Sequence, residues 1–467
     1  MPRRAALPVS ALRWGRRLGA LLTAVALAAG LSPALAQPAA PGGAGAYATT
    51  LQYVVRFYPR WFSYVQGQRI PANRLVAPAH MSPVFGEVVA PNDDTLYASS
   101  FMYLSAQPVI LTIPRTAVTY SVLSMNAYGT AFSTRVGNGT PGRYALTGPG
   151  WSGRLPRGVT RVRVPDSFSI WIIRADKYSA SGTRQIAQAE RFRARLRAQA
   201  LAQYRKNPSG GATRIVPVAL YTVRYKLLAD REIRRAPVTF LRQLQAAVRA
   251  PGTPPLAGGS LRLARRFGRL FGSGHFGTRA ARAPFARGAR AAHRLIVARY
   301  HSHTGATRWV SFTDIAAWGR RYLNRAATTE YLQYSNTHAT SAYYQAFTDG
   351  RGRPLNAAAH GYVLTFAKGQ LPQAKRFWSL TAYLPESITL VRNPARKYVV
   401  AGYTPGLRRG PGGSVSVYLA AARPRGVPAA NWLPVPAGRF NVVLRVYGPE
   451  GTVAAGSYVP PRIRIFR

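Results

Sequence analysis

The chain alternates between two kinds of sequence pattern, and this alternation constrains its fold more than any other feature. Residues 83–175, and again the residues after 361, contain short runs of β-branched and aromatic side chains separated by turn residues. Such runs at regular spacing are typical of antiparallel β-sandwiches. Between them, residues 183–344 carry apolar side chains at helical spacing. We therefore predict a multi-domain α+β protein, mainly β, with a helical middle.

The predicted segments follow from this pattern. A linker and an N-terminal helix occupy residues 37–79, a first β domain 80–178, a helical region 179–350 and a second β domain 351–467. The expected helices are 47–65, 184–204, 238–248, 261–271, 286–300 and 315–332. The expected strands are 84–89, 95–104, 108–113, 118–125, 131–136, 143–146, 159–164 and 168–174, then 362–366, 377–383, 397–400, 415–420, 440–447 and 462–466.

The helix at 261–271 has an apolar face and a basic face. Leu263, Phe267 and Phe271 share one side, and four arginines lie elsewhere. A helix at a membrane surface and a packed helix with a solvated basic face both explain this arrangement.

The N-terminus has the pattern of an export signal. Five arginines precede or flank an apolar stretch from Leu18 to Leu31, and Ala34-Leu35-Ala36 offers a small-x-small cleavage site before Gln37. The apolar stretch is shorter than the roughly 20 residues of a membrane-spanning helix. We therefore predict a signal peptide at 1–36, general secretory export, and a location in the periplasm or cell envelope.

The charge balance is extreme. The chain has 64 Lys plus Arg against 13 Asp plus Glu, a net charge of +51. The arginines are dispersed rather than clustered, which disfavours a nucleic-acid footprint. An acidic surrounding medium is an alternative cause, because paired carboxylates lose their stabilising charge as pH falls. With no cysteine, the exported chain must rely on core burial without disulfides.

Two groups of motifs resemble known domains of undetermined function. The motif Asn92-Asp93-Asp94-Thr95-Leu96-Tyr97 and the later Gly148-Pro149-Gly150-Trp151 resemble the domain of unknown function 1254. Phe377-Trp378-Ser379-Leu380-Thr381, Asn431-Trp432-Leu433-Pro434 and Arg445-Val446-Tyr447-Gly448-Pro449 resemble its usual C-terminal partner, the domain of unknown function 1214. The resemblance implies a cell-envelope protein with an immunoglobulin-like sandwich, a helical middle and a C-terminal jelly roll, and it implies no reaction.

The same motifs supply the candidate ligand-binding residues. Asn92, Asp93, Asp94 and Tyr97 form a polar loop that either contacts a ligand or caps its own backbone in an Asx turn. Trp378 and Trp432 either line an apolar pocket of the jelly roll or pack in its core. Arg174 and Arg325 are further candidates for recognition of a carboxylate or sulfate.

Other chemistry is poorly supported by the sequence. No G-x-S-x-G elbow occurs, and Gly137 to Gly142 matches a dinucleotide fingerprint only by letter, since no helix follows it. His301-x-His303 lacks a third ligand nearby, and His338 and His360 suit hydrogen-bonded structural roles. We predict no metal and no cofactor, and the catalytic residues stay unknown.

The sequence therefore favours an exported protein that binds a small or amphipathic ligand between its β domains. An envelope hydrolase or lyase acting on a lipid, ester or glycan through Asp94 or a histidine is the first alternative, and a structural or assembly protein of the envelope is the second. A homo-oligomer is possible, nucleic-acid binding is not expected, and any membrane contact would be peripheral.

Overall fold

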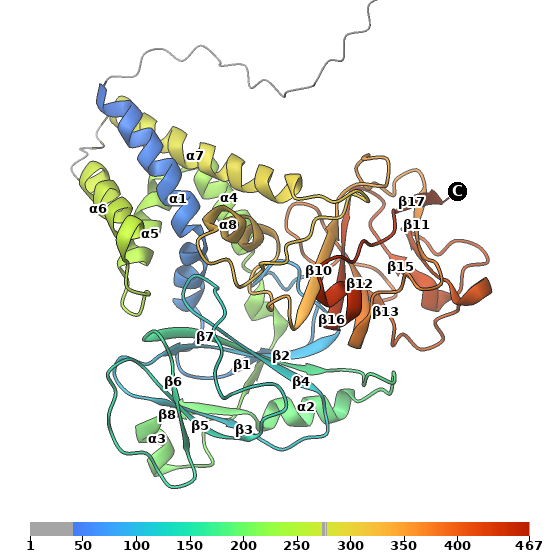
Figure 1. Cartoon of the computed structure of the whole chain (residues 1–467), viewed down its shortest axis with the longest axis horizontal. Coiled ribbons are helices and arrows are strands. Elements are labelled where there is room, and N and C mark those ends of the chain that lie inside the picture. Colours follow the sequence, from blue (N-terminus) through green and yellow to red (C-terminus); the bar gives the residue numbers. More distant parts are fainter. Residues whose placement is uncertain (1–40, 273–275, 277, 467) are drawn as a thin grey trace, which may run out of the picture. The chain divides into compact units, whose positions relative to one another are not determined.

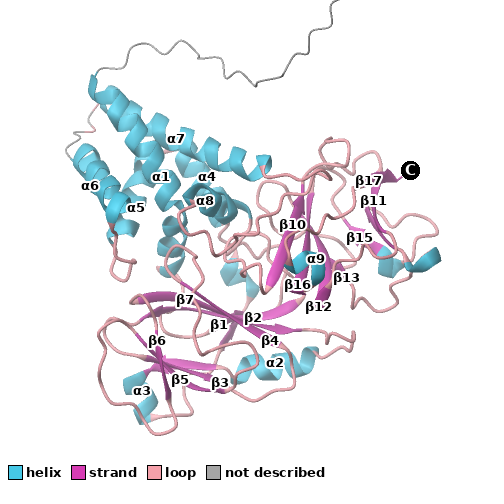
Figure 2. Cartoon of the chain, viewed as in Figure 1, coloured by secondary structure: helices cyan, strands magenta, loops and turns pink. Residues whose placement is uncertain are grey.

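A computed structural model describes residues 41–272, 276 and 278–466. The chain forms two β-sandwiches and a helical region (Figures 1 and 2). Most of the helices lie between the two sandwiches in the sequence. This confirms the predicted fold class. The predicted signal peptide at 1–36 lies outside the described residues. Within them, no helix combines the length and apolarity needed to cross a membrane.

The N-terminal sandwich consists of two sheets. Its first sheet has the order β4-β7-β2-β1-β9, and its second has the order β6-β5-β3-β8. Apolar side chains from both sheets, among them Leu96, Met102, Leu111 and Trp171, form the core between them. The strands are β1 (Val76–Pro78), β2 (Thr95–Tyr103), β3 (Val109–Ile113), β4 (Tyr120–Met125), β5 (Gly142–Thr147), β6 (Thr160–Arg163), β7 (Phe168–Asp176), β8 (Arg197–Ala200) and β9 (Arg214–Val216).

The C-terminal sandwich is built in the same way. Its sheets have the orders β10-β16-β12-β13 and β15-β14-β11-β17. Leu364, Leu380, Val417 and Leu444 are fully buried between them. The strands are β10 (Ser341–Ala346), β11 (Gly361–Phe366), β12 (Ala374–Tyr383), β13 (Val399–Ala401), β14 (Val415–Ala420), β15 (Trp432–Pro434), β16 (Asn441–Pro449) and β17 (Arg464–Phe466), and the short helix α9 (Gly451–Ala454) follows β16.

The helical region packs around the predicted N-terminal helix. Its core includes Phe57, Trp61 and Phe240, all buried. The helices are α1 (Pro41–Gly67), α4 (Tyr225–Arg235), α5 (Pro237–Arg249), α6 (Gly258–Gly272), α7 (Arg279–Ser302) and α8 (Tyr322–Tyr331), while α2 (Ile186–Arg195), α3 (Leu201–Lys206) and the short 3-10 turn Val218–Tyr221 belong to the connection that leads to them.

The basic helix predicted at 261–271 is a packed helix. Its apolar face, with Leu263, Phe267 and Phe271, belongs to the helical core. The ring of Phe267 stacks on that of Tyr53 in α1, with 3.9 Å between ring centroids. Burial against α1 therefore accounts for the apolar face.

Two predicted helices are shorter than expected. The predicted helix 184–204 is interrupted by β8, whose residues pair with β3 although their sequence Arg-Ala-Gln-Ala favours helix. The predicted helix 315–332 begins only at Tyr322, because Ala316 and Gly319 adopt positive φ angles of 59° and 54°, which an α-helix does not allow. Tertiary pairing and local backbone geometry override the apolar spacing in these two segments.

Two predicted strands are absent as regular elements among the described residues. Segment 84–89 is a loop whose Phe85 and Val89 side chains are buried in a cluster with helical and C-terminal residues. Segment 131–136 makes only an isolated bridge from Ala131 to Met125. Conversely, β1, β8, β9, β10 and β15 were not predicted, because each is short or lies in a segment with helical composition.

Candidate functional site

A cavity lies where the N-terminal sandwich, the C-terminal sandwich and the segment after α8 meet. Its interior offers about 80 Å³ to the centres of water-sized atoms, which is room for roughly six waters. Alternate residues of the paired strands β2 and β7 form one wall, because side chains two apart on a strand share a face. Its apolar lining includes Phe85, Val89, Phe101, Ile170, Ile172 and Leu332.

The Asn92 loop forms an edge of this cavity. The Oδ1 atom of Asn92 accepts hydrogen bonds from the backbone N–H groups of Asp94 and Thr95, both at 3.2 Å. Its Nδ2 group donates to the Tyr447 hydroxyl at 2.6 Å, and its backbone N–H donates to the Tyr97 hydroxyl at 3.3 Å. The Asx turn expected from the sequence is therefore present, and it holds a residue that also lines the cavity.

The two aspartates beside Asn92 lie outside the cavity lining. Asp94 is fully buried and accepts hydrogen bonds from Ser379 at 2.8 Å and Tyr403 at 2.5 Å. Burial raises the pKa of Asp94, against the opposing effect of those hydrogen bonds and of Arg445. Asp93 forms an ion pair with Lys177 at 2.5 Å. Asp94 thus joins β2 to the C-terminal sandwich and is not available as a catalytic acid in the cavity.

Two buried arginines contribute to the lining. Arg174 donates from Nη1 to the side-chain oxygen of Asn336 at 2.9 Å and from Nη2 to the Tyr334 carbonyl at 3.0 Å. Arg445 donates from Nη2 to the Ala90 carbonyl at 2.5 Å. Its Nη1 atom is buried and has no hydrogen-bond partner within the described part of the chain.

An acidic group and a phenol occupy another part of the lining. Glu87 and Tyr221 also line a neighbouring cleft that includes Arg69. One carboxyl oxygen of Glu87 and the hydroxyl of Tyr221 are buried without a hydrogen-bond partner among the residues described. Burial raises the pKa of Glu87 to about 8, although Arg69 opposes the shift. At neutral pH this carboxyl group is therefore mostly protonated and able to donate a proton or a hydrogen bond.

The two predicted tryptophans do not line the cavity. Trp378 is buried in the core of the C-terminal sandwich, with its ring centroid 5.3 Å from that of Phe366. Trp432 donates from its indole N–H to the Ala420 carbonyl at 2.9 Å. Of the six predicted ligand-binding residues, the cavity brings together Asn92 and Tyr97 and leaves Asp93, Asp94, Trp378 and Trp432 outside.

Sequence reasoning did not list Arg445 as a site residue. The signal that could have found it is its position in β16, where Arg445 interrupts a run of apolar residues that are buried on both faces of the strand. A charged residue in such a run needs a specific partner.

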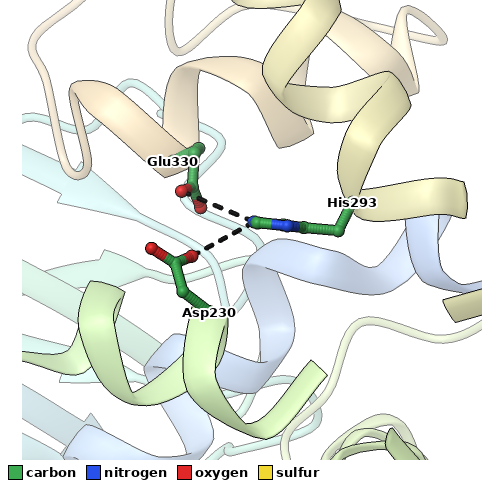
Figure 3. Close-up of side chains that lie close together, drawn as sticks. All are labelled: Asp230, His293 and Glu330. Atoms are coloured by element: carbon green, nitrogen blue, oxygen red, sulfur yellow. Dashed lines mark ion pairs between the residues drawn. The ribbon is translucent and has the colours of Figure 1, made fainter. Parts of the chain in front are cut away.

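A second cluster of ionisable groups lies among the helices. Figure 3 shows Asp230 of α4, His293 of α7 and Glu330 of α8 pointing toward one another. His293 Nε2 lies 3.1 Å from an Asp230 oxygen and 3.6 Å from a Glu330 oxygen. Lys226 lies 2.7 Å from Asp230 and 2.6 Å from Glu330. The lysine ammonium thus bridges the carboxylates at the place where a metal cation would bind.

The pKa shifts in this cluster fit an ionic network. Burial alone would raise the pKa of Glu330, but Lys226 and His293 hold it well below its usual value. Burial would lower the pKa of His293, but hydrogen bonds to Asp230 and Glu330 raise it to about 9. Glu330 is therefore ionised and His293 protonated near neutral pH, and Lys226 and His293 supply the positive charge that a bound metal ion would otherwise supply to Glu330.

The histidines and the arginine that the sequence suggested as further candidates all have hydrogen bonds or ring contacts within the fold. His301 is 3.0 Å from the Tyr331 hydroxyl, His338 is 2.8 Å from the Val453 carbonyl, and His360 is 3.1 Å from the Tyr362 hydroxyl. The ring of His303 stacks on Phe312. Arg325 is buried and donates to the Arg56 carbonyl at 2.6 Å, with its guanidinium over the Tyr128 ring. None of these five residues lines the cavity.

Comparisons with known proteins identify two family domains. Residues 72–200 match the model described as protein of unknown function (DUF1254), and residues 340–451 match the one described as protein of unknown function (DUF1214). The order of the two domains is the one predicted from the motifs. No curated protein matches the chain.

Two solved structures are similar to the chain over most of its length. The crystal structure of the VPA0106 protein from Vibrio parahaemolyticus matches with a TM-score of 0.57 and 18% identity, over 90% of this chain and 100% of that one. The crystal structure of a putative uncharacterized protein from Burkholderia cenocepacia matches with a TM-score of 0.39 and 12% identity, over 91% of this chain and 94% of that one. The first similarity shows a shared fold.

Proposed function

We propose that this protein, which belongs to the two-domain family that joins DUF1254 to DUF1214, binds a small amphipathic molecule in the cavity between its two sandwiches. The observation that carries the proposal is the composition of the lining. Apolar side chains cover most of the walls, and polar groups from both family domains line the same space, among them Asn92 and Tyr97 from the first and Tyr447 from the second. Such a combination is typical of ligand pockets in proteins.

The bonds around Asn92 support this proposal. They fix the cavity edge by joining the start of β2 to Tyr447 of β16. The polar groups are thus held in place by both sandwiches before any ligand arrives, which reduces the ordering cost of binding.

We also propose that binding takes place outside the cytoplasm. The arginine-rich start, the apolar stretch and the Ala34-Leu35-Ala36 site support export. The intact mass of the protein from its native host checks this, because cleavage would leave Gln37 as the first residue.

Filling the cavity tests the binding function. Ser99 lies in β2 between Tyr97 and Phe101, and all three side chains line the cavity. We expect Ser99→Phe to place a ring in the cavity and to abolish binding of small molecules that co-purify with the native protein. Native mass spectrometry of the protein from its own host is the measurement.

The matched control is Ser152→Phe, the same chemical change at an exposed position. It should retain any bound mass. A native protein that carries no small molecule, or a bound mass that survives in Ser99→Phe, would contradict ligand binding in this cavity.

A further inference from the structure

The lining of the cavity contains two cations that form no ion pair among the described residues, although Arg445 still feels the charge of the Asp94 carboxyl. Arg174 and Arg445 are 6% and 2% exposed. Their hydrogen bonds go to an amide oxygen and to backbone carbonyls, which carry no net charge. Neither arginine forms an ion pair among the described residues. Buried charges in proteins are normally paired at close range, and neither arginine has such a partner in the lining.

The acidic residues nearby are committed elsewhere. Asp94 accepts hydrogen bonds from Ser379 and Tyr403, and Asp176 is paired with Arg376. Glu87 is the one acidic residue in the described lining, and its raised pKa leaves it mostly uncharged at neutral pH. The charge of the two arginines is therefore not cancelled from within the lining.

Hydrogen-bond donors belong to three residues that line the same cavity, Tyr97, Arg445 and Tyr447. Nη1 of Arg445 is buried without an acceptor in the described structure. The hydroxyls of Tyr97 and Tyr447 each accept a hydrogen bond from Asn92, so their own protons stay free to donate. By donating to both hydroxyl oxygens, Asn92 leaves each phenol with a proton that it can donate to another group. A group of donors with two cations in the same lining suits an acceptor that carries negative charge.

We infer that the cavity binds a small organic anion, with its anionic head group on Arg445, Tyr97 and Tyr447 and its apolar body against β7. This inference rests on the proposed binding function and adds the chemical class of the ligand. Arg174, with its guanidinium 5.2 Å from the centroid of the Tyr97 ring, adds positive charge beside the head group. Ile170 and Ile172 of β7 supply the apolar contact. The cavity volume limits the ligand to a few heavy atoms beyond the head group.

Three probes of nearly equal size and different charge test this inference. Isothermal titration of the mature protein with hexanoate, hexan-1-ol and hexylamine at pH 7 should show hexanoate binding at least tenfold tighter than hexan-1-ol and no binding of hexylamine. Equal affinity for acid and alcohol, or preference for the amine, would overturn the inference.

Variants locate the head group. Arg445→Met and Tyr97→Phe should each weaken hexanoate at least tenfold and leave hexan-1-ol unchanged. Tyr97→Phe keeps the ring and removes one hydroxyl, so it keeps the test decisive if Arg445→Met does not fold. Arg439→Met and Tyr418→Phe are matched controls outside the lining, and both should bind like the native protein.

The outcomes separate the inference from the proposed function. If hexan-1-ol binds as well as hexanoate and Ser99→Phe blocks both, the cavity is a binding site but the anion class is wrong. If hexanoate binds equally to Arg445→Met, Tyr97→Phe and the native protein, the head group lies elsewhere and the inference is wrong. If no probe binds and no native mass is found, the binding function itself is wrong.

Discussion

Two adjacent aspartates show how much the surroundings of a residue decide its role. Asp94 is fully buried and accepts hydrogen bonds from Ser379 of β12 and from Tyr403. Asp93 is partly exposed and pairs with Lys177. Nothing in the sequence distinguishes the two aspartates. In the structure they differ in how far they are removed from water and in how many donors bond to them.

We therefore expect Asp94→Ala to destabilise the protein by about 2–4 kcal/mol, because two buried hydroxyl donors lose their acceptor. Asp93→Ala, which removes a partly exposed ion pair, should cost less than about 1 kcal/mol. Urea unfolding of both variants checks this. Equal losses of unfolding free energy would mean that the contacts of Asp94 do not hold the two sandwiches together.

At the scale of single residues, part of the candidate site could be predicted from the sequence. The Asn92 loop stands out because an Asn-Asp-Asp run is unusual in a chain so poor in acids, and Asn92 and Tyr97 do line the cavity. Glu87 and Tyr221 could not be found this way, because what distinguishes them is a polar atom buried without a hydrogen-bond partner in the described structure, and Arg445 stands out only by interrupting the apolar run of β16. Burial of that kind depends on contacts between segments hundreds of residues apart.

At the scale of elements, regular strands and long helices could be predicted, and short edge strands could not. β2, β7, β12 and β16 follow from their alternating or continuous apolar runs. β8 pairs with β3 only because the fold brings them together, since its Ala and Gln residues prefer helix. The composition of residues 84–89 predicts a strand, but the segment is a loop. Its apolar side chains are buried by packing between the sandwiches and the helices.

The contact between α7 and α1 depends on a glycine. A Cβ atom at Gly288 would lie 2.7 Å from the Tyr47 carbonyl oxygen and 2.8 Å from the Thr50 Cβ atom. Alanine normally favours a helix interior over glycine by about 1 kcal/mol. Here we expect Gly288→Ala to destabilise the protein by about 1–3 kcal/mol, because α7 would have to move away from α1.

Gly268 of α6 is the matched control, since the nearest atom to a Cβ there is the flexible end of Arg249 at 3.2 Å. Gly268→Ala should be neutral or stabilising by up to about 1 kcal/mol. Thermal unfolding of both variants is the measurement. Stabilisation by Gly288→Ala would show that α1 and α7 pack less closely than the structure has them.

For the whole molecule, the small number of acids determines how stability responds to pH. Burial raises the pKa of Glu87 to about 8, and burial also raises that of Asp176 to about 6 although Arg376 opposes the shift. The pKa of His293 is raised to about 9. In each case the folded protein holds its proton at a higher pH than the unfolded chain does, so each group stabilises the fold below its unfolded pKa and loses that effect as pH rises through its folded pKa.

Groups of the opposite sign act outside this range. Glu330, whose pKa is lowered, stabilises the fold above pH 4.5 and loses that effect only as pH falls further toward its folded pKa. Burial lowers the pKa of Lys397 to about 8, so its contribution grows as pH rises above that value. Between about pH 5 and pH 8 the pKa shifts of Glu87, Asp176 and His293 dominate the change of folding stability with pH. All three make the fold more stable at lower pH.

We therefore expect the melting temperature to fall steadily from pH 5 to pH 8, unlike that of a protein stabilised mainly by paired carboxylates. His293→Gln should flatten the fall between pH 6.5 and 9, where the native His293 contributes up to about 3 kcal/mol. Glu87→Gln should flatten it between pH 5 and 8. A melting series from pH 3 to pH 9 on the three proteins checks this. A maximum near pH 7 with collapse below pH 4 would contradict both this expectation and the acidic-medium interpretation of the charge, because it would mean that the few carboxylates stabilise the fold through their charge.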